Sequence, residues 1–396
     1  MDRSGLCHQV RQALKRLPPP FANHYEVVPL PPPAASPPIT AVMREIQAAS
    51  AALSRLETLT SELGDPWLVS RILMRREAVS SSAIEGTNST LDELLAVEET
   101  GDTRAQDAAR QVRDYALCLD AAVPQATSLG PSVFTSGLIS ELHRAVMHSE
   151  TAYPGTPGET RTRVVWIGGR GDIAYSTYNP TPPEDIGRCL ADTIAYMRGD
   201  ADETWPPHII IRMAVAHAHF EAVHPFADGN GRVGRQLLPL LMAAQGRAPL
   251  FLSPYIEAHR SAYYAALEAA QQRLLWHEII GFVWDAVTGS VAELLATRRA
   301  LQELRTLWLA RRKFRSRSAA LRALDVLPHY PVTTTGRLAA LLDVSAAQAG
   351  QAVQQLMGAG ILVERTGYRR NRLFAASEAL SIINRPFGDD PILPPA

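Results

Sequence analysis

The chain has 396 residues, a formal net charge of −1 and a hydrophobic fraction of 46%. This length exceeds what one core usually holds, so two or three domains are expected, and the near-zero charge excludes a protein that binds polyanions through its overall charge. Three widely separated cysteines favour a reducing compartment. Because no apolar leader and no apolar run of membrane length is apparent, we expect a cytoplasmic protein without membrane contact.

The first forty residues are rich in proline, with the runs LPPP, PLPPP and SPP. Proline fixes φ and removes a backbone donor, so this part should be extended and lie across a folded body. From Thr40 the apolar residues recur at helical spacing. A second helix should start at Asp65-Pro66 and run to about Glu85, with Gly86 just beyond its end.

The centre of the chain alternates between helical patterns and one strand-like stretch. Apolar periodicity predicts helices at 104–123, 135–148, 183–198, 207–223, 236–245, 257–272 and 275–311. The stretch VVWIGGRGDIAYSTY has β-branched and aromatic flanks around a glycine-rich turn, which predicts a β-hairpin. The expected fold class is therefore mainly α with one β-hairpin in its central part.

The stretch HPFADGNGRVGR, residues 224–235, combines a histidine, a carboxylate, three glycines and two arginines. The proline after His224 disfavours helix at that position, so the histidine should lie in a loop before the next helix, which should start near Gly231. Backbone N–H groups at a glycine-rich helix N-terminus favour phosphate. Arg232 and Arg235 lie on one helix face and can reach the same oxygens, whereas Asp228 offers the hard oxygen that Mg²⁺ prefers.

This pattern predicts a diphosphate cradle with a metal ligand and an adjacent base. The pKa of free histidine is about 6.5, and a nearby positive helix end should keep His224 neutral and able to accept a proton. A lone histidine before proline is more often structural, and DGNG alone is usually only a turn. A zinc site at His217, His219, Glu221 and His224 is disfavoured, because His217 and His219 point to different helix faces.

The same stretch resembles the Fic family motif, HPFx(D/E)GNGRxxR, at every fixed position. The resemblance implies transfer of AMP from ATP to a Ser, Thr or Tyr hydroxyl of a target protein, including the chain itself. It also implies roles for the motif residues: His224 as general base, Asp228 as Mg²⁺ ligand, Gly229, Asn230 and Gly231 as anion hole, and Arg232 and Arg235 as phosphate ligands. Relatives differ in which part of the nucleotide they move, so other nucleotide transfers stay open.

Two further stretches resemble parts of this family that surround the motif. GETRTRVVWIGG followed by AYSTYNPTPPEDI resembles the hairpin, or flap, that holds the target chain by strand pairing. The target-positioning residues implied are Trp166, Ile167, Gly168 and Gly169. Tyr264, in a tyrosine pair, would border the adenine, although burial in the core explains that pair equally well.

Upstream, SSSAIEG resembles the family's inhibitory motif (S/T)xxxE(G/N), here Ser81, Glu85 and Gly86. A glutamate on the last turn of a helix faces an unfavourable dipole unless a cation compensates for it. The resemblance implies that Glu85 pairs with Arg235 and blocks productive ATP binding. In some relatives the same glutamate helps water to remove AMP, so a hydrolytic mode is left open.

Residues 318–376 resemble a winged helix–turn–helix. Short helices are predicted at 319–327, 335–342 and 346–358, with Ser345 as N-cap of the last, followed by a strand–turn–strand around 366–372. The last helix should expose glutamines able to contact bases, and the wing supplies arginines for phosphates. These residues are Gln348, Gln351, Gln354, Gln355, Arg365, Arg369, Arg370 and Arg372.

The sequence thus predicts an N-terminal region at 1–100 with an inhibitory helix, a Fic core with following helices at 101–312, a winged-helix domain at 313–380 and a tail at 381–396. An adenylyltransferase that uses ATP and Mg²⁺ is the first hypothesis. The alternative is a DNA-binding transcriptional regulator whose core senses nucleotide, and a protein-contact or homodimer role for the winged helix stays open.

Overall fold

The computed structural model describes residues 1–34, 43–62, 67–101, 107–200, 208–367 and 372–395, and it is mainly helical, as predicted. The central helices are α2 (Met43–Glu62), α3 (Trp67–Ile84), α4 (Leu91–Thr100), α5 (Asp107–Leu129), α6 (Ser136–Val146), α7 (Ile186–Arg198), α8 (Ile209–Val223), α9 (Asn230–Ala244), α10 (Ser253–Ala258), α11 (Arg260–Arg273) and α12 (Trp276–Arg311). Their order follows the predicted one closely, which reflects the strong helical periodicity of the sequence.

The helix boundaries next to the motif lie within one residue of the expected ones. α3 ends at Ile84, just before the expected end at about Glu85, and α9 begins at Asn230, just before the start expected near Gly231. The helix expected at 257–272 is two helices, α10 and α11, separated at His259. Residues 63–66 and 102–106, which include expected helix starts, lie outside the described part of the chain.

Helix α8 forms the centre of the main core. Every residue from Ile209 to Val223 is buried, and the helix contacts α7, α9, α11 and α12. A helix that is buried all round shows little amphipathic periodicity, which explains its nearly continuous apolar sequence. Because α8 is held on all sides, the loop that follows it at His224 is placed by the core of the protein.

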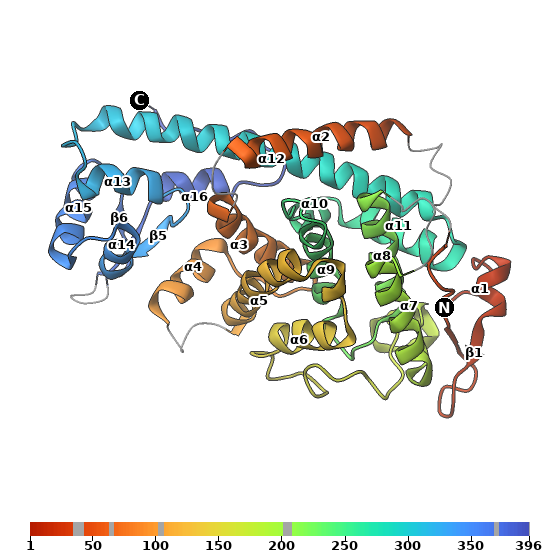
Figure 1. Ribbon diagram of the computed structural model, residues 1–396. Coiled ribbons are helices and arrows are strands. Elements are labelled where there is room, and N and C mark those ends of the chain that lie inside the picture. Colours follow the sequence, from red (N-terminus) through yellow and green to blue (C-terminus); the bar gives the residue numbers. More distant parts are fainter. Residues whose placement is uncertain (35–42, 63–66, 102–106, 201–207, 368–371, 396) are drawn as a thin grey trace.

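Helix α12 runs along the length of the molecule beside α2 and extends from the central helices to the C-terminal elements (Figure 1). By length and composition it is apolar enough to cross a membrane, so the expectation that no run approaches membrane length was wrong. Half of that apolar window is buried against other parts of the protein. A core helix shows the same composition, and α12 supplies buried residues to two of the hydrophobic clusters.

The C-terminal elements pack around a second hydrophobic cluster that includes Leu304 and Trp308 of α12. They are α13 (Ala319–Val326), β5 (Val332–Thr334), α14 (Thr335–Leu342), α15 (Ala346–Gly358), β6 (Val363–Glu364), β7 (Leu373–Ala375) and α16 (Ser377–Ile383). The strands form an antiparallel sheet in the order β5-β7-β6. Ser345 caps α15 in a capping box with Gln348, which confirms the predicted N-cap.

The proline-rich start folds into short elements instead of remaining entirely extended. They are α1 (His8–Gln12) and the antiparallel pair β1 (Leu14–Arg16) and β2 (Tyr25–Val27). Leu6, Val10 and Val27 are buried with Tyr178 and Ala222 of the central body. The segment therefore does lie across the body, as predicted, at the opposite end of the molecule from the C-terminal elements (Figure 1).

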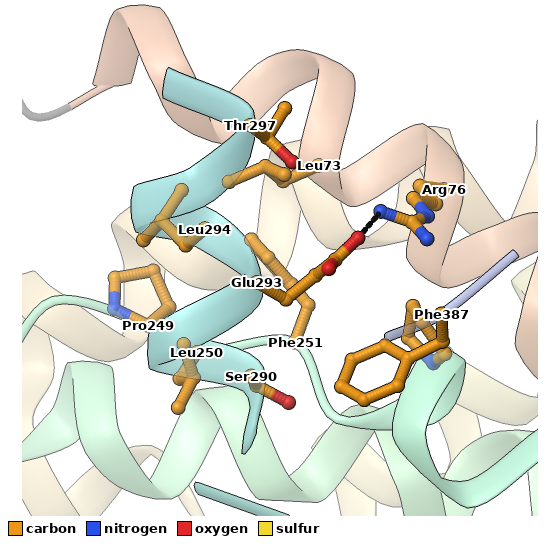
Figure 2. Close-up of a pocket in the computed structure, with 11 residues that line it drawn as sticks. Leu73, Arg76, Pro249, Leu250, Phe251, Ser290, Glu293, Leu294, Thr297 and Phe387 are labelled. Atoms are coloured by element: carbon orange, nitrogen blue, oxygen red, sulfur yellow. Dashed lines mark hydrogen bonds and ion pairs between the residues drawn. The ribbon is translucent and has the colours of Figure 1, made fainter. Parts of the chain in front are cut away.

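Buried ion pairs anchor helix α3 to the rest of the protein. Figure 2 shows Arg76 of α3 reaching across a pocket to Glu293 of α12. Their atoms Nη1 and Oε1 lie 2.7 Å apart, and the other Glu293 oxygen accepts from Arg385 at 2.9 Å. This network ties the helix that precedes Glu85 to α12 and to the C-terminal segment.

Replacing Arg76 by alanine is expected to lower the free energy of unfolding by about 2–3 kcal/mol, because it removes the buried charge-assisted hydrogen bond to Glu293 and the bond to the Arg385 carbonyl, while Arg385 still balances Glu293. Chemical unfolding measures the change. The matched control is Arg299→Ala, which breaks the exposed Arg299–Glu303 pair on the same α12 helix and should cost no more than about 1 kcal/mol. Equal losses in the two variants would show that the Arg76 network does not anchor α3.

Candidate active site

His224 lies at the turn between α8 and α9. It adopts the left-handed conformation, with φ 51° and ψ 61°, and ends α8 through a hydrogen bond from its N–H to the Phe220 carbonyl. The loop is closed by Asn230, whose side-chain oxygen accepts from the Phe226 N–H at 2.8 Å while its amide donates to the Phe226 carbonyl at 2.9 Å. The Asn230 side chain is therefore committed to the loop, and only its backbone can serve an anion.

The environment of His224 keeps its imidazole neutral. Burial first, and then the nearby Arg161 guanidinium, lower the pKa of His224 to about 4 against a smaller opposing effect of Glu85. A histidine with this pKa is unprotonated at neutral pH and can accept a proton from a substrate. The structure thus agrees with the neutral base that the sequence predicts.

The N-terminus of α9 forms an anion-binding surface next to this histidine. Gly229 caps the helix with φ 78°, and Arg232 is 3% exposed. Two of the guanidinium nitrogens of Arg232, Nε and Nη1, are buried and find no hydrogen-bond partner among the described residues. Buried donors normally have partners, so a cradle with unused donors at a helix N-terminus is suited to a phosphate.

Asp228 is the residue of this loop that could hold a metal. Its side chain is exposed, and one carboxylate oxygen accepts from the Gly229 N–H at 2.6 Å. The described residues contain no cluster of three or more potential protein ligands. A single carboxylate beside a phosphate site is nevertheless sufficient for Mg²⁺, which usually keeps its waters and takes its remaining ligands from substrate phosphates.

Glu85 occupies the same cradle from the end of α3. Its Oε1 lies 2.7 Å from Nη2 of the fully buried Arg235, which also donates to the Ser81 hydroxyl at 2.9 Å and to the Ser81 carbonyl at 3.0 Å. A Cβ on Gly231 would lie only 2.1 Å from that Glu85 oxygen. The carboxylate therefore lies directly over the first turn of α9, where an anion would bind.

The charge of Glu85 is maintained by its partner. Burial alone would raise the pKa of Glu85, but the Arg235 guanidinium outweighs that effect and the pKa is lowered. A lowered carboxyl pKa means that the ion pair is intact above the ordinary value of about 4.5 and is lost only on stronger acidification. The contact between Glu85 and Arg235 is consequently present across the neutral range.

A pocket of about 370 Å³ joins this cradle to the strand pair predicted as a flap. Its lining includes Glu85, His224, Arg235, Tyr264 and Ile167. Tyr264 is 46% exposed, unlike its fully buried neighbour in the tyrosine pair. A cavity of this size, lined by both polar and apolar side chains, can hold a nucleotide.

The predicted hairpin consists of two very short strands, β3 (Ile167–Gly168) and β4 (Ser176–Tyr178), with a register shift between Ile167 and Gly168. Gly169 has φ 75°, and a Cβ there would lie 2.9 Å from the Ser176 nitrogen, so the turn requires glycine. Trp166 packs edge to face on Phe21 of the N-terminal segment, with ring centroids 5.6 Å apart.

Two buried residues at the site were not predicted as functional. Arg161 donates through Nε to the His224 carbonyl at 2.9 Å. The sequence does not predict this contact, because the two residues are far apart in the chain. Glu221 lines the pocket with an Oε1 that has no hydrogen-bond partner in the described part of the chain, and burial raises its pKa to about 8. His217 bonds Tyr263 and His219 bonds Thr193, so they point apart and do not form the zinc site that was disfavoured.

Two adjacent segments of the chain match models of known protein families. Residues 43–124 match the Fic/DOC family N-terminal region and residues 133–242 match the Fic/DOC family. Protein adenylyltransferase fic-1 of Caenorhabditis briggsae is 36% identical over 132 residues, which are 33% of this chain and 23% of that protein. Protein adenylyltransferase Fic of Culex quinquefasciatus is 28% identical over 198 residues, 48% of this chain and 36% of that protein.

The matched region thus spans about a quarter to a third of these curated relatives. Among solved structures, a Fic family protein of Desulfovibrio desulfuricans aligns with 88% of this chain and 98% of its own, at a TM-score of 0.56 and 20% identity. Fic-1 of Caenorhabditis elegans aligns with 65% of this chain and 74% of its own, at a TM-score of 0.51 and 23% identity. Both Fic/DOC family segments are thus matched in order within residues 43–242, and the fold is shared with solved Fic family proteins.

Proposed function

We propose that this protein transfers AMP from ATP to a hydroxyl group of a target protein. The observation that carries the proposal is the juxtaposition of the neutral His224 with a phosphate cradle whose Arg232 has unused buried donors. The curated relatives are named protein adenylyltransferases, which supports the same activity. The target would be held by strand pairing with β3, where Trp166, Ile167, Gly168 and Gly169 lie.

The chemistry follows from these positions. His224 would take the proton of the target hydroxyl as its oxygen attacks the α-phosphorus; the new O–P bond forms, the bond to the β-phosphate bridging oxygen breaks, and pyrophosphate leaves. The α9 N-terminus and Arg232 would orient the phosphates, and Tyr264 would border the base. Mg²⁺ held by Asp228 would neutralise phosphate charge.

The resting state should be inhibited. Arg235 would contact the γ-phosphate in a productive complex, but here its donors are taken by Glu85 and Ser81. ATP could then bind only with its phosphates displaced from the first turn of α9. Autoinhibition is thus proposed to act through competition between one carboxylate and the terminal phosphate for the same guanidinium.

The transferred group can be identified by the position of the label. With the Glu85→Gly variant, ATP labelled at the α-phosphate is expected to label protein, whereas ATP labelled at the γ-phosphate should not. Scintillation counting of precipitated protein measures both. Protein labelled only from the γ-position would replace AMP transfer by phosphoryl transfer, and label from neither position would reject nucleotide transfer altogether.

The C-terminal elements support a winged helix–turn–helix as an accessory domain, because α13, β5, α14, α15, β6 and β7 follow one another in the order of that fold. Gln348, Gln351 and Gln354 are exposed on α15 as predicted. Against DNA binding, Arg365 lies 3.5 Å from Asp92 of α4 and Arg372 pairs with Glu364. Because both of these wing arginines face carboxylates, we favour the enzyme over the DNA-binding regulator. Arg369 and Arg370 lie outside the described residues.

A further inference from the structure

Arg161 holds the loop that contains His224 through backbone contacts alone. Its Nε donates to the His224 carbonyl at 2.9 Å, and its own N–H donates to the Pro225 carbonyl at 2.9 Å. The remaining guanidinium nitrogens donate to the carbonyls of Arg163 and Thr181. One residue, through its side chain and its backbone, therefore fixes the position of His224.

These hydrogen bonds from Arg161 are needed because His224 adopts an unfavourable backbone conformation. A non-glycine residue at φ 51° is strained, and such strain persists only where the surrounding structure determines the conformation. The proline after it offers no N–H to stabilise the turn. The two hydrogen bonds from Arg161 supply the external constraint that the loop itself lacks.

Arg161 is 5% exposed, and every hydrogen bond described for its side chain goes to a neutral carbonyl. A buried cation of this kind requires a compensating negative charge. Glu26 of β2 is 2% exposed, and its Oε1 has no hydrogen-bond partner among the described residues. It is also the carboxyl whose charge raises the pKa of Arg161, which burial lowers to about 10.

The N-terminal strand β2 is tied to the same backbone as Arg161. The Val27 N–H donates to the Asn179 carbonyl at 2.9 Å, and the Asn179 side chain donates to the Tyr25 carbonyl at 2.8 Å. These contacts flank Glu26 on both sides. Asn179 is two residues before Thr181, whose carbonyl accepts from the Arg161 guanidinium. These hydrogen bonds therefore fix the backbone of Glu26 beside the segment that contacts Arg161.

We propose that Glu26 is a positioning residue that holds His224 in its reactive place by balancing the charge of Arg161. Residues 1–34 lie outside both family matches, so this adds an N-terminal contribution to the active site that the motif does not contain. The expected effect on the rate of AMP transfer rests on the proposed function, whereas the positioning of the loop does not. No direct ion pair joins the two described side chains, so the effect acts across the buried space between them.

The charge on Glu26 depends on pH in the neutral range. Burial raises the pKa of Glu26 to about 7, Arg161 and Lys15 oppose the rise, and Glu184 and Asp185 add to it. Glu26 is therefore ionised, and Arg161 balanced, above about pH 7, and this balance is lost as the pH falls through that value. His224 itself titrates separately, because its pKa is about 4.

The test compares Glu26→Gln with Glu184→Gln, both in a Glu85→Gly background. Glu26→Gln is expected to lower kcat about tenfold with the KM for ATP unchanged, because misplacing a catalytic group costs rate while the phosphate cradle stays intact. Glu184→Gln removes a nearby carboxylate whose side chain is 68% exposed, and kcat should stay within about twofold.

Two further readouts separate positioning from a general loss of structure. The kcat of the Glu85→Gly parent should fall as pH decreases from 8 to about 6, and Glu26→Gln should lack that inflection. Hydrogen–deuterium exchange at 224–230 should be faster in Glu26→Gln than in Glu184→Gln, whether or not the protein transfers AMP.

An unchanged kcat in a folded Glu26→Gln, the same inflection in both proteins, or unchanged exchange at the loop would overturn the proposal. The pH profile of the Glu85→Gly parent requires no Glu26 substitution, so if Glu26→Gln fails to fold, a parent kcat that does not fall between pH 8 and about 6 overturns the proposal. If Glu85→Gly transfers nothing while the exchange differs as expected, the proposed function fails and the positioning role stands.

Discussion

Glu85→Gly is expected to label protein with AMP about 10- to 100-fold faster than the unchanged chain. The substitution removes the charge-assisted hydrogen bond of 2.7 Å between Glu85 and Arg235, and bonds of this type contribute about 1.5–3 kcal/mol. It also clears the carboxylate oxygen from the space above Gly231. Both changes make Arg235 and the first turn of α9 available to the phosphates of ATP.

Ser81→Ala provides a graded comparison for this prediction. It removes the hydroxyl that accepts from Arg235 Nε at 2.9 Å but leaves Glu85 in place, so its rate should rise less than that of Glu85→Gly. Acidification to pH 6 should not activate the unchanged chain, because the pKa of Glu85 is lowered by Arg235. Equal labelling by the unchanged chain and Glu85→Gly would reject the inhibitory role.

The same two proteins decide whether Glu85 has a second role. Protein labelled by Glu85→Gly can be freed of ATP and then mixed with the unchanged chain. Loss of label that requires Glu85 would assign this carboxylate to the hydrolytic removal of AMP, the alternative that the sequence left open. Stable label would restrict Glu85 to inhibition.

The helical part of the fold was predictable because its signals are local. Ser345 caps α15 as its sequence position indicates, and α14 starts at Thr335 as expected. The β1–β2 pair was not predicted, since each strand has three residues and its burial depends on Tyr178 and Ala222, far along the chain. Proline-rich composition gave no sign of this pairing.

The site was predictable as far as its residues are contiguous. The motif at 224–235 predicted that His224, a glycine-rich helix start and Arg235 lie together, because they share one loop and the first turns of α9. The motif could not show that the Asn230 side chain is used within the loop, or that Arg161 donates to the His224 carbonyl. Such contacts join segments that only the folded core of α8 brings together.

His224→Ala in the Glu85→Gly background is expected to reduce AMP transfer by about 10²–10⁴-fold, the usual contribution of a general base. Alanine in a left-handed conformation adds strain, so His224→Asn is the matched variant, because asparagine tolerates that conformation and still cannot act as the base. Both variants should bind ATP with unchanged affinity by calorimetry, since Arg232 and the α9 N-terminus are untouched.

The two measurements together separate catalysis from nucleotide sensing. Lost transfer with retained ATP binding would place His224 in the chemical step, because only the proton acceptor has been removed. Full transfer by His224→Asn would contradict its role as base. If the Glu85→Gly parent itself showed no transfer while His224→Ala still shifted DNA in electrophoresis, the DNA-binding regulator would be the better account. A regulator needs Arg232 and Arg235 to sense phosphate, but it has no use for a half-buried neutral histidine beside them.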